Sequence, residues 1–189
     1  MTTSKRLFDI LFSSFALLTL SAVWASVAII VKLTSQGKVL YWSMRIGKCN
    51  TVFLMPKFRT MRSDTPVVAT HLLANPDAYL TPVGKFLRTT SLDELPQLYS
   101  ILLGHMSFVG PRPALFNQAD LIELRTLAGV HVLTPGLTGW AQVNGRDELP
   151  IPNKVELDKV YLQRQSWLFD LQILLLTFVK VLRRDGVVH

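Results

Sequence analysis

The chain has 189 residues, a formal net charge of +7 and a single cysteine, Cys49. One compact domain with a membrane element suits this length, and a lone cysteine excludes an internal disulfide. The composition, 49% hydrophobic and only 17% charged residues, is unusual for a soluble domain and indicates that part of the apolar surface contacts lipid. The positive charge favours an anionic partner such as a membrane surface, a nucleotide, a phospholipid or a nucleic acid.

The first predicted element is an uncharged run at 11–31, LFSSFALLTLSAVWASVAIIV, which is long enough to cross a bilayer core. Cations lie on both sides of it, and the preference for cytoplasmic positive charge would place both ends in the cytoplasm. Two interpretations stay open: a straight spanning helix, or a re-entrant helix bent at Ser13–Ser14 or Ser21. The flanking cations are Lys5, Arg6, Lys32, Lys38, Arg45 and Lys48.

A β-hairpin is predicted next, with strands at 39–42 and 51–55 around a turn at 45–50. The basic segment 57–62 that follows is either a solvated edge or a contact for a diphosphate or lipid headgroups. Residues 64–82 are typical of a surface loop with one helical turn, and 83–88 of a short amphipathic helix.

Two adjacent carboxylates, Asp93 and Glu94, stand in the segment SLDELPQ at 91–97. The segment fits a capping box, which needs no catalytic role. Pro96 favours a helix start nearer Asp93, where the missing N–H costs nothing. The positive end of the helix dipole would then favour an ionised Asp93. Neighbouring helical residues point about 100° apart, so one carboxylate could attack while the other holds a cation.

Prolines on both sides hold Arg112 in an extended segment, although such a sequence is also typical of a surface turn. Helices are predicted at 95–103 and 118–128. The stretch 134–146 is predicted to be a turn-rich loop whose three glycines let backbone N–H groups approach a ligand. It matches no dinucleotide or Walker fingerprint.

Two helices are predicted at the end of the chain, at 155–165 and 168–182. The second is apolar and ends in cations, which suits either a helix lying at a membrane surface or a buried core helix.

Long motifs in this order resemble the bacterial sugar transferases, specifically the small, single-domain, monotopic polyprenyl-phosphate glycosyl-1-phosphate transferases. The resemblance covers the chain from Lys5 to Val187. The motifs are KFRTM (57–61), GKFLR (84–88), SLDELPQL (91–98), MSFVGPRP (106–113), PGLTGWAQVNGR (135–146) and the D-x-x-Y…D pattern of Asp158, Tyr161 and Asp170.

The resemblance implies an α/β fold, rich in helix with a short β-hairpin. Residues 1–36 would form a re-entrant membrane helix, and 37–189 a catalytic domain seated by interfacial helices on the cytoplasmic face of the bacterial inner membrane. This family usually breaks its re-entrant helix at Ser-Pro, where this chain has Ser21–Ala22. The Ser21 hydroxyl could still bend the helix by bonding a carbonyl one turn back.

The implied reaction transfers a sugar-1-phosphate from a UDP-sugar to undecaprenyl phosphate and releases UMP. It would initiate the assembly of a glycan such as O-antigen, capsule, exopolysaccharide or glycoprotein. Mg²⁺ is the implied cofactor. Lipids of the inner membrane are implied partners, nucleic acid is not, and a homodimer stays open.

By resemblance, Asp93 is the nucleophile that forms an aspartyl phosphosugar. Glu94, with Asp93 beside it, holds the Mg²⁺, and Arg112 clamps phosphate. The remaining implied contacts, to diphosphate, uridine or lipid phosphate, are Lys57, Arg88, Gln142, Arg146 and Asp170.

Two other functions fit the same residues. A membrane-bound, Mg²⁺-dependent phosphohydrolase would use Asp93 with water as the acceptor. A non-enzymatic basic module would bind anionic lipid without needing Asp93 or Glu94.

Overall fold

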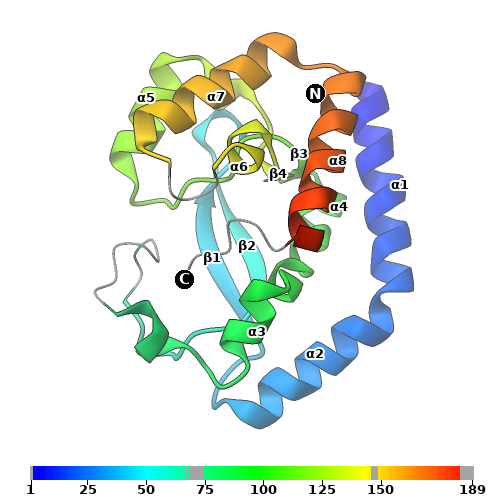
Figure 1. Ribbon diagram of the computed structural model, residues 1–189, viewed down its shortest axis with the longest axis vertical. Coiled ribbons are helices and arrows are strands. Elements are labelled where there is room, and N and C mark those ends of the chain that lie inside the picture. The colour runs from blue at the N-terminus through cyan, green and yellow to red at the C-terminus, as the bar shows by residue number, and fades with distance from the viewer. Residues whose placement is uncertain (1, 67, 69–74, 146–148, 184–189) are drawn as a thin grey trace.

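The structure is a computed structural model that describes residues 2–66, 68, 75–145 and 149–183. It confirms a mixed α/β fold rich in helix, with two small two-stranded sheets (Figure 1). The elements in chain order are α1 (Thr3–Thr19), α2 (Ser21–Thr34), β1 (Leu40–Ile46), η1 (Lys48–Asn50), β2 (Val52–Phe58), η3 (Pro76–Tyr79), α3 (Gly84–Thr89), η4 (Leu92–Glu94), α4 (Gln97–Leu103), β3 (Ser107–Val109), α5 (Ala119–Leu127), η5 (Val130–Val132), β4 (Gly136–Thr138), α6 (Trp140–Val143), α7 (Ile151–Arg164) and α8 (Trp167–Arg183).

Helices α1 and α2 form a bent pair along one edge of the molecule (Figure 1). Their axes differ by 62° at Leu20, and within the described residues no single helix is long and apolar enough to cross a membrane, although the pair meets that test together. The apolar run is therefore two helices rather than one straight helix, and the break lies beside Ser21, as the resemblance implied. At the bend, the hydroxyl that donates one turn back is Thr19, to the Phe15 carbonyl at 2.9 Å, rather than Ser21.

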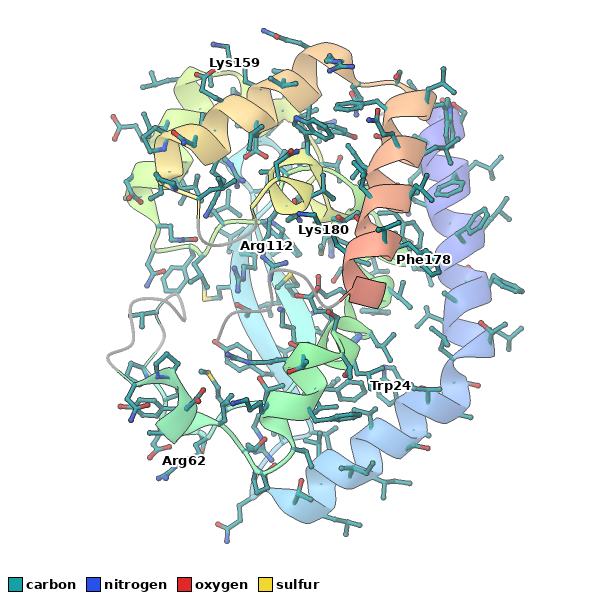
Figure 2. All side chains as sticks on the ribbon, in the orientation of Figure 1. Trp24, Arg62, Arg112, Lys159, Phe178 and Lys180 are labelled. Carbon is teal, nitrogen blue, oxygen red and sulfur yellow. The ribbon has the colours of Figure 1, made fainter. Side chains whose placement is uncertain are left out.

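The bent pair has a packed inner face and an apolar outer face. Val27 and Val31 of α2 are buried against Phe58 and Leu87. On the outer side, large apolar side chains extend away from the protein (Figure 2). The exposed ones on these helices are Leu7, Leu11, Phe12, Phe15, Leu18, Leu20, Val23, Ile29, Ile30 and Leu33.

The first two cations of the chain hold α1 to the rest of the protein. The Lys5 ammonium forms a buried ion pair with Asp170 and donates to the Tyr161 hydroxyl at 3.1 Å. The Arg6 guanidinium donates to the Ile101 and Leu102 carbonyls, each at 2.6 Å, and so satisfies the C-terminal end of α4. Both residues were expected to be charges that flank the apolar run and indicate its orientation in a membrane. Their contacts within the protein make them weaker evidence for that orientation.

The predicted hairpin is confirmed and is longer than expected. Strands β1 and β2 pair antiparallel from Leu40↔Phe58 to Ile46↔Val52. One face packs on α4, where Phe53 and Met55 meet Ile101 in a hydrophobic cluster. The hairpin thereby fixes the end of β2 beside the start of α4.

A second sheet was not predicted from the sequence. Strands β3 and β4 pair in parallel, with Ser107 opposite Gly136 and Val109 opposite Thr138. The predicted loop at 134–146 therefore contains a strand and the short helix α6. Three-residue strands are too short to give a periodic signal, and the glycines permit close backbone packing: a Cβ on Gly136 would lie 2.1 Å from the Gly110 nitrogen.

Helix α8 has one buried face and one exposed apolar face. Phe169 and Ile173 are buried in a core with Val109 and Tyr161. Its opposite face is exposed and apolar, with Leu168 81% exposed. The helix is therefore part of the core on one side and lies open on the other.

Candidate active site

A tight turn presents the acid pair. Ser91 has φ of +56°, in the left-handed region, and η4 follows immediately. Helix α4 starts at Gln97, and Pro96 is its N-cap residue. Pro96 has no N–H to donate to a preceding turn, so the helix does not extend further toward Asp93. The Ser91 side chain makes no capping hydrogen bond, so the predicted capping box is wrong.

Lys57, Glu94 and Arg112 meet at one carboxylate oxygen. Glu94 Oε1 lies 2.7 Å from Lys57 Nζ and 3.1 Å from Arg112 Nη2. The same lysine lies 3.9 Å from Asp93 Oδ2. The structure therefore brings together four predicted site residues, from the end of β2, from η4 and from the segment after β3.

The pKa values of the two carboxylates shift in opposite directions because their charged partners differ. Asp93 is only 6% exposed, and burial raises its pKa; the negative charge of Glu94 raises it further, while Lys57 opposes the shift. Burial would also raise the pKa of Glu94, but Lys57 and Arg112 outweigh it and hold that pKa well below its usual range. Glu94 therefore carries the firmly ionised charge of the pair.

Arg88 completes the group of cations around Asp93. Its Nε donates to Thr60 Oγ1 at 3.0 Å, which fixes the guanidinium beside the acid pair. Burial lowers the pKa of Arg88, and the charge of Asp93 opposes that shift. An arginine nevertheless stays protonated in proteins, so Arg88 remains a cation here.

Two predicted site residues do not join this group, and a third is not described by the structure. Gln142 is buried on α6 with its Nε2 3.4 Å from the Leu137 carbonyl oxygen. Asp170 is buried against Lys5 and Tyr161. Arg146 lies outside the described residues.

Thr60, which accepts from Arg88, and Gln97, at the start of α4, were assigned no role from the sequence. Gln97 is 2% exposed, and within the described residues its Nε2 has no hydrogen-bond partner. It lies in the SLDELPQL motif and is the first residue of α4. Thr60 likewise lies in the KFRTM motif, but only the fold places it against Arg88.

The two carboxylates fit a magnesium ion that is shared with substrate. Within the described residues no group of three or more His, Cys, Asp or Glu side chains is placed to hold a metal alone. Mg²⁺ is commonly held by one or two carboxylates together with substrate phosphates. Asp93 and Glu94 can supply that number, and the neighbouring cations suit the phosphates.

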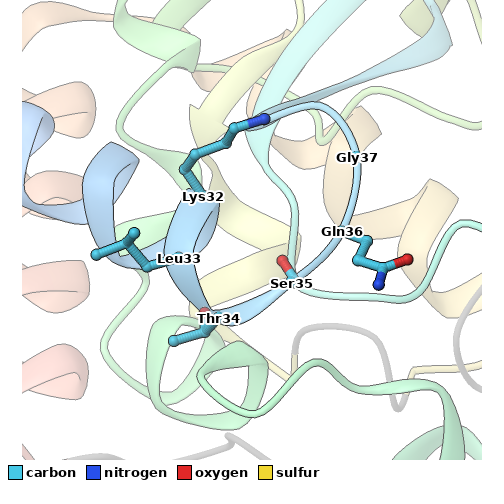
Figure 3. Close-up of a pocket in the computed structure, with 6 residues that line it drawn as sticks. All are labelled: Lys32, Leu33, Thr34, Ser35, Gln36 and Gly37. Atoms are coloured by element: carbon cyan, nitrogen blue, oxygen red, sulfur yellow. The ribbon is translucent and has the colours of Figure 1, made fainter.

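A hollow of about 420 Å³ lies elsewhere, at the turn between α2 and β1 (Figure 3). Residues 32–37 line it, and Lys32 is the charged member of that lining. It therefore lacks the carboxylates that define the Asp93 site.

Neighbouring carboxylates that face several cations suit enzymes that act on phosphate esters and anhydrides. The chain belongs to the bacterial sugar transferase family, whose sequence profile matches residues 1–184. It is thus a transferase, and the predicted resemblance is confirmed.

Relatives match almost the whole chain. The uncharacterized sugar transferase EpsL of Bacillus subtilis is 38% identical over 97% of this chain and 89% of its own length. The exopolysaccharide production protein ExoY of Rhizobium meliloti is 39% identical, covering 97% and 87%. A UDP-glucose:undecaprenyl-phosphate glucose-1-phosphate transferase of Escherichia coli is 40% identical over 93% of this chain, which spans only 39% of that longer protein.

Proposed function

We propose that this enzyme transfers a sugar-1-phosphate from a UDP-sugar to undecaprenyl phosphate, with release of UMP, through an aspartyl phosphosugar. The observation that carries the proposal is the pair of the buried Asp93 and the half-buried Glu94, set against Lys57, Arg88 and Arg112. Relatives named as undecaprenyl-phosphate glucose-1-phosphate transferases support the same donor and acceptor classes.

In the first step, an Asp93 carboxylate oxygen attacks the phosphorus that carries the sugar. The bond from this phosphorus to the UMP oxygen breaks, and UMP leaves with the electron pair. A buried carboxylate is poorly solvated, which makes it a stronger nucleophile once ionised. Lys57 and Arg88 stabilise the charge that develops on the phosphate oxygens.

In the second step, a phosphate oxygen of undecaprenyl phosphate attacks the same phosphorus, and Asp93 leaves as the carboxylate. Both steps are displacements at one phosphorus, so one small site serves a soluble donor and a lipid acceptor in turn. The planar guanidinium of Arg112 can donate two hydrogen bonds to one phosphate, and we assign it to a phosphate group whose bonds do not change in the reaction.

Glu94 and Asp93 are the proposed magnesium ligands. When bound, Mg²⁺ would neutralise charge on the diphosphate oxygens. Glu94 suits this role because its low pKa keeps it ionised. Lys57 and Arg112, which contact Glu94 Oε1 in this structure, fix the orientation of its carboxylate beside Asp93.

The test is UMP release by the purified protein from a UDP-sugar, with undecaprenyl phosphate and Mg²⁺. We expect Asp93→Asn to lower turnover by about 10⁴-fold or more, because it removes the nucleophile. Asp64→Asn is the matched control, since Asp64 is an exposed carboxylate paired with the exposed Arg62, and it should keep full activity. Normal turnover in Asp93→Asn would contradict the mechanism, and release of free sugar phosphate from donor alone would identify a hydrolase.

We also propose that α1 and α2 enter the cytoplasmic leaflet of the inner membrane and return to the same side. The supporting observations are the 62° bend and the exposed apolar outer faces of α1, α2 and α8. Phe178, labelled in Figure 2, is 62% exposed on the α8 face that would rest on the lipid. A re-entrant pair would bring both flanks, and so the catalytic site, to the cytoplasmic face.

Cysteine labelling tests this arrangement. Thr2→Cys in a Cys49→Ser background should resist a membrane-impermeant thiol reagent in intact cells and react in inverted vesicles. A cysteine replacing exposed Ser63 is the cytoplasmic reference. Labelling of Cys at position 2 from outside intact cells would show a full crossing instead.

A further inference from the structure

The backbone on either side of the Arg112 side chain is held through its carbonyl groups. We call residues 111–114 the Arg112 arm. Four consecutive carbonyl oxygens of this arm each accept one hydrogen bond from a different donor. The pairs are Pro111 O with Gly136 N at 2.9 Å, Arg112 O with Arg125 Nη1 at 2.8 Å, Pro113 O with Arg45 Nη1 at 3.1 Å and Ala114 O with Ile46 N at 2.9 Å.

The sequence of the arm explains why its carbonyl groups, rather than its N–H groups, make the hydrogen bonds that hold it. Pro111 and Pro113 have no N–H, so the arm cannot donate the regular backbone hydrogen bonds of a β-strand. Acceptors are the groups that remain, and donors must come from elsewhere in the fold. Two of the four donors are arginine side chains, which lie on α5 and β1.

Arg125 is the donor closest to the phosphate-binding residue itself. Its side chain is buried, and its Nε and Nη2 donate to Asp158 Oδ2 at 2.9 and 2.6 Å. Its remaining Nη1 donates to the Arg112 carbonyl. Asp158, on α7, is 1% exposed, so this pair is a fixed bracket between α5, α7 and the arm.

We infer that Arg125, oriented by Asp158, is a positioning residue that fixes the Arg112 backbone so that the Arg112 guanidinium reaches the acid pair and the substrate phosphate. This inference rests on the proposed function. It also gives a role to the first residue of the D-x-x-Y pattern, which the catalytic proposal left without one. A lysine could not replace Arg125, because one ammonium cannot direct donors to Asp158 and to the arm in the same fork geometry.

The experiment must separate positioning from stability, because removing one partner of a buried ion pair destabilises the fold. The central variant is therefore the double substitution Arg125→Met/Asp158→Leu. It replaces both charges with apolar groups of similar size, which often preserves stability while removing the donor to Arg112. Lys159→Met is the control on the same helix, since Lys159 lies at the outer edge of α7 (Figure 2) and forms only an exposed pair with Glu156.

Two readouts are measured on the full chain. The first is turnover, for which we expect a decrease of about 10- to 100-fold in the double variant at a thermal midpoint close to that of wild type. The decrease should be non-additive with Arg112→Ala, because both substitutions would impair the same guanidinium. Lys159→Met should behave as wild type.

The second readout needs no activity. Arg112–Pro113 is the one Arg-Pro pair in the sequence, so ¹³C-carbonyl arginine with ¹⁵N-proline labelling isolates the Arg112 carbonyl by NMR. Loss of the hydrogen bond should move this resonance upfield in the double variant. If wild type fails to turn over a UDP-sugar, the proposed function is contradicted, while this resonance still decides the inference.

Full turnover in the folded double variant, additivity with Arg112→Ala, or an unmoved Arg112 carbonyl resonance would each overturn the inference. If the double variant does not fold, Arg125→Lys replaces it, because it keeps a cation beside Asp158. Arg125→Lys should then show the same upfield shift and reduced turnover. Wild-type values of both in Arg125→Lys would equally contradict a positioning role.

Discussion

Two buried carboxylate clusters in this protein each contain a lysine, and they differ in their balance of charge. At the acid pair, Lys57, Arg88 and Arg112 surround the two carboxylates Asp93 and Glu94. At the other cluster, Asp170 is paired with Lys5 and accepts from the Tyr161 hydroxyl at 2.7 Å.

The two clusters differ in net charge: the Asp93 site has an excess of positive charge that an anion could neutralise, and the Asp170 cluster does not. Three cations against two carboxylates leave one positive charge over, which a phosphate can neutralise. At the second cluster the single Lys5 ammonium pairs with Asp170 and also lies near the buried Asp9, so no positive charge is left over. Burial and the neighbouring Asp170 charge raise the pKa of Tyr161, so its hydroxyl stays protonated. The second cluster therefore ties α1, α7 and α8 together, whereas the first has the surplus positive charge that the proposed phosphate chemistry requires.

The sharpest test of this contrast is to neutralise Asp170. We expect Asp170→Asn to destabilise the fold by about 3–5 kcal/mol, because it leaves the Lys5 ammonium buried without its counter-charge. Thermal unfolding with a kcat and KM measurement on the folded fraction checks this. A folded variant with unchanged stability and a raised KM would show instead that Asp170 contacts substrate, as the sequence resemblance implied.

Protonation of Asp93 gives a second, smaller test. Because burial raises its pKa, the acid limb of kcat/KM should lie at higher pH than for an ordinary aspartate, and activity should be lost as pH falls through that limb. A limb at or below the ordinary aspartate range would contradict a buried nucleophile.

The same shift has a consequence for stability. A raised folded-state pKa means that the folded protein holds the Asp93 proton more tightly than the unfolded chain does. The contribution of Asp93 to the free energy of unfolding therefore decreases as pH rises from the unfolded pKa through the folded one. Asp93→Asn should consequently be more stable than wild type above this window, and equal thermal midpoints at neutral pH would argue against it.

The smallest expected effect is at Ser91. Its positive φ costs about 1 kcal/mol for a residue with a side chain, and glycine adopts this conformation freely. We expect Ser91→Gly to keep turnover and to change the free energy of unfolding by no more than about 1 kcal/mol. Ser91→Val, which cannot adopt the turn easily, should lower both; a fully active Ser91→Val would show that the turn does not set the acid pair.

Local patterns predicted much of this structure. The hairpin, α3, α5 and α7 follow from periodicity and from the positions of glycine and proline. The family resemblance, rather than a local pattern, assigned Lys57, Glu94 and Arg112 to one site, and the structure places them in contact. The bend beside Ser21 was also predicted, although a proline was lacking there.

The failures concern contacts between distant segments. The β3–β4 pair joins residues 107–109 to 136–138, and strands of three residues carry no periodic signal. Lys5 and Arg6 look like membrane flanks in the sequence, and only tertiary packing shows that they clasp Asp170 and the end of α4. Arg125 shows the same limitation, because no local pattern links it to Arg112, 13 residues earlier.

The central claim is that Asp93 becomes covalently bound to the sugar phosphate. Its most direct test is intact-protein and peptide mass spectrometry after rapid acid quench of the enzyme with a UDP-sugar and Mg²⁺, without lipid acceptor. We predict a mass increase of one sugar phosphate on the peptide that contains Asp93, its absence in Asp93→Asn, and its loss when undecaprenyl phosphate is added. Product formation at the normal rate with no such adduct at any time point would contradict the account.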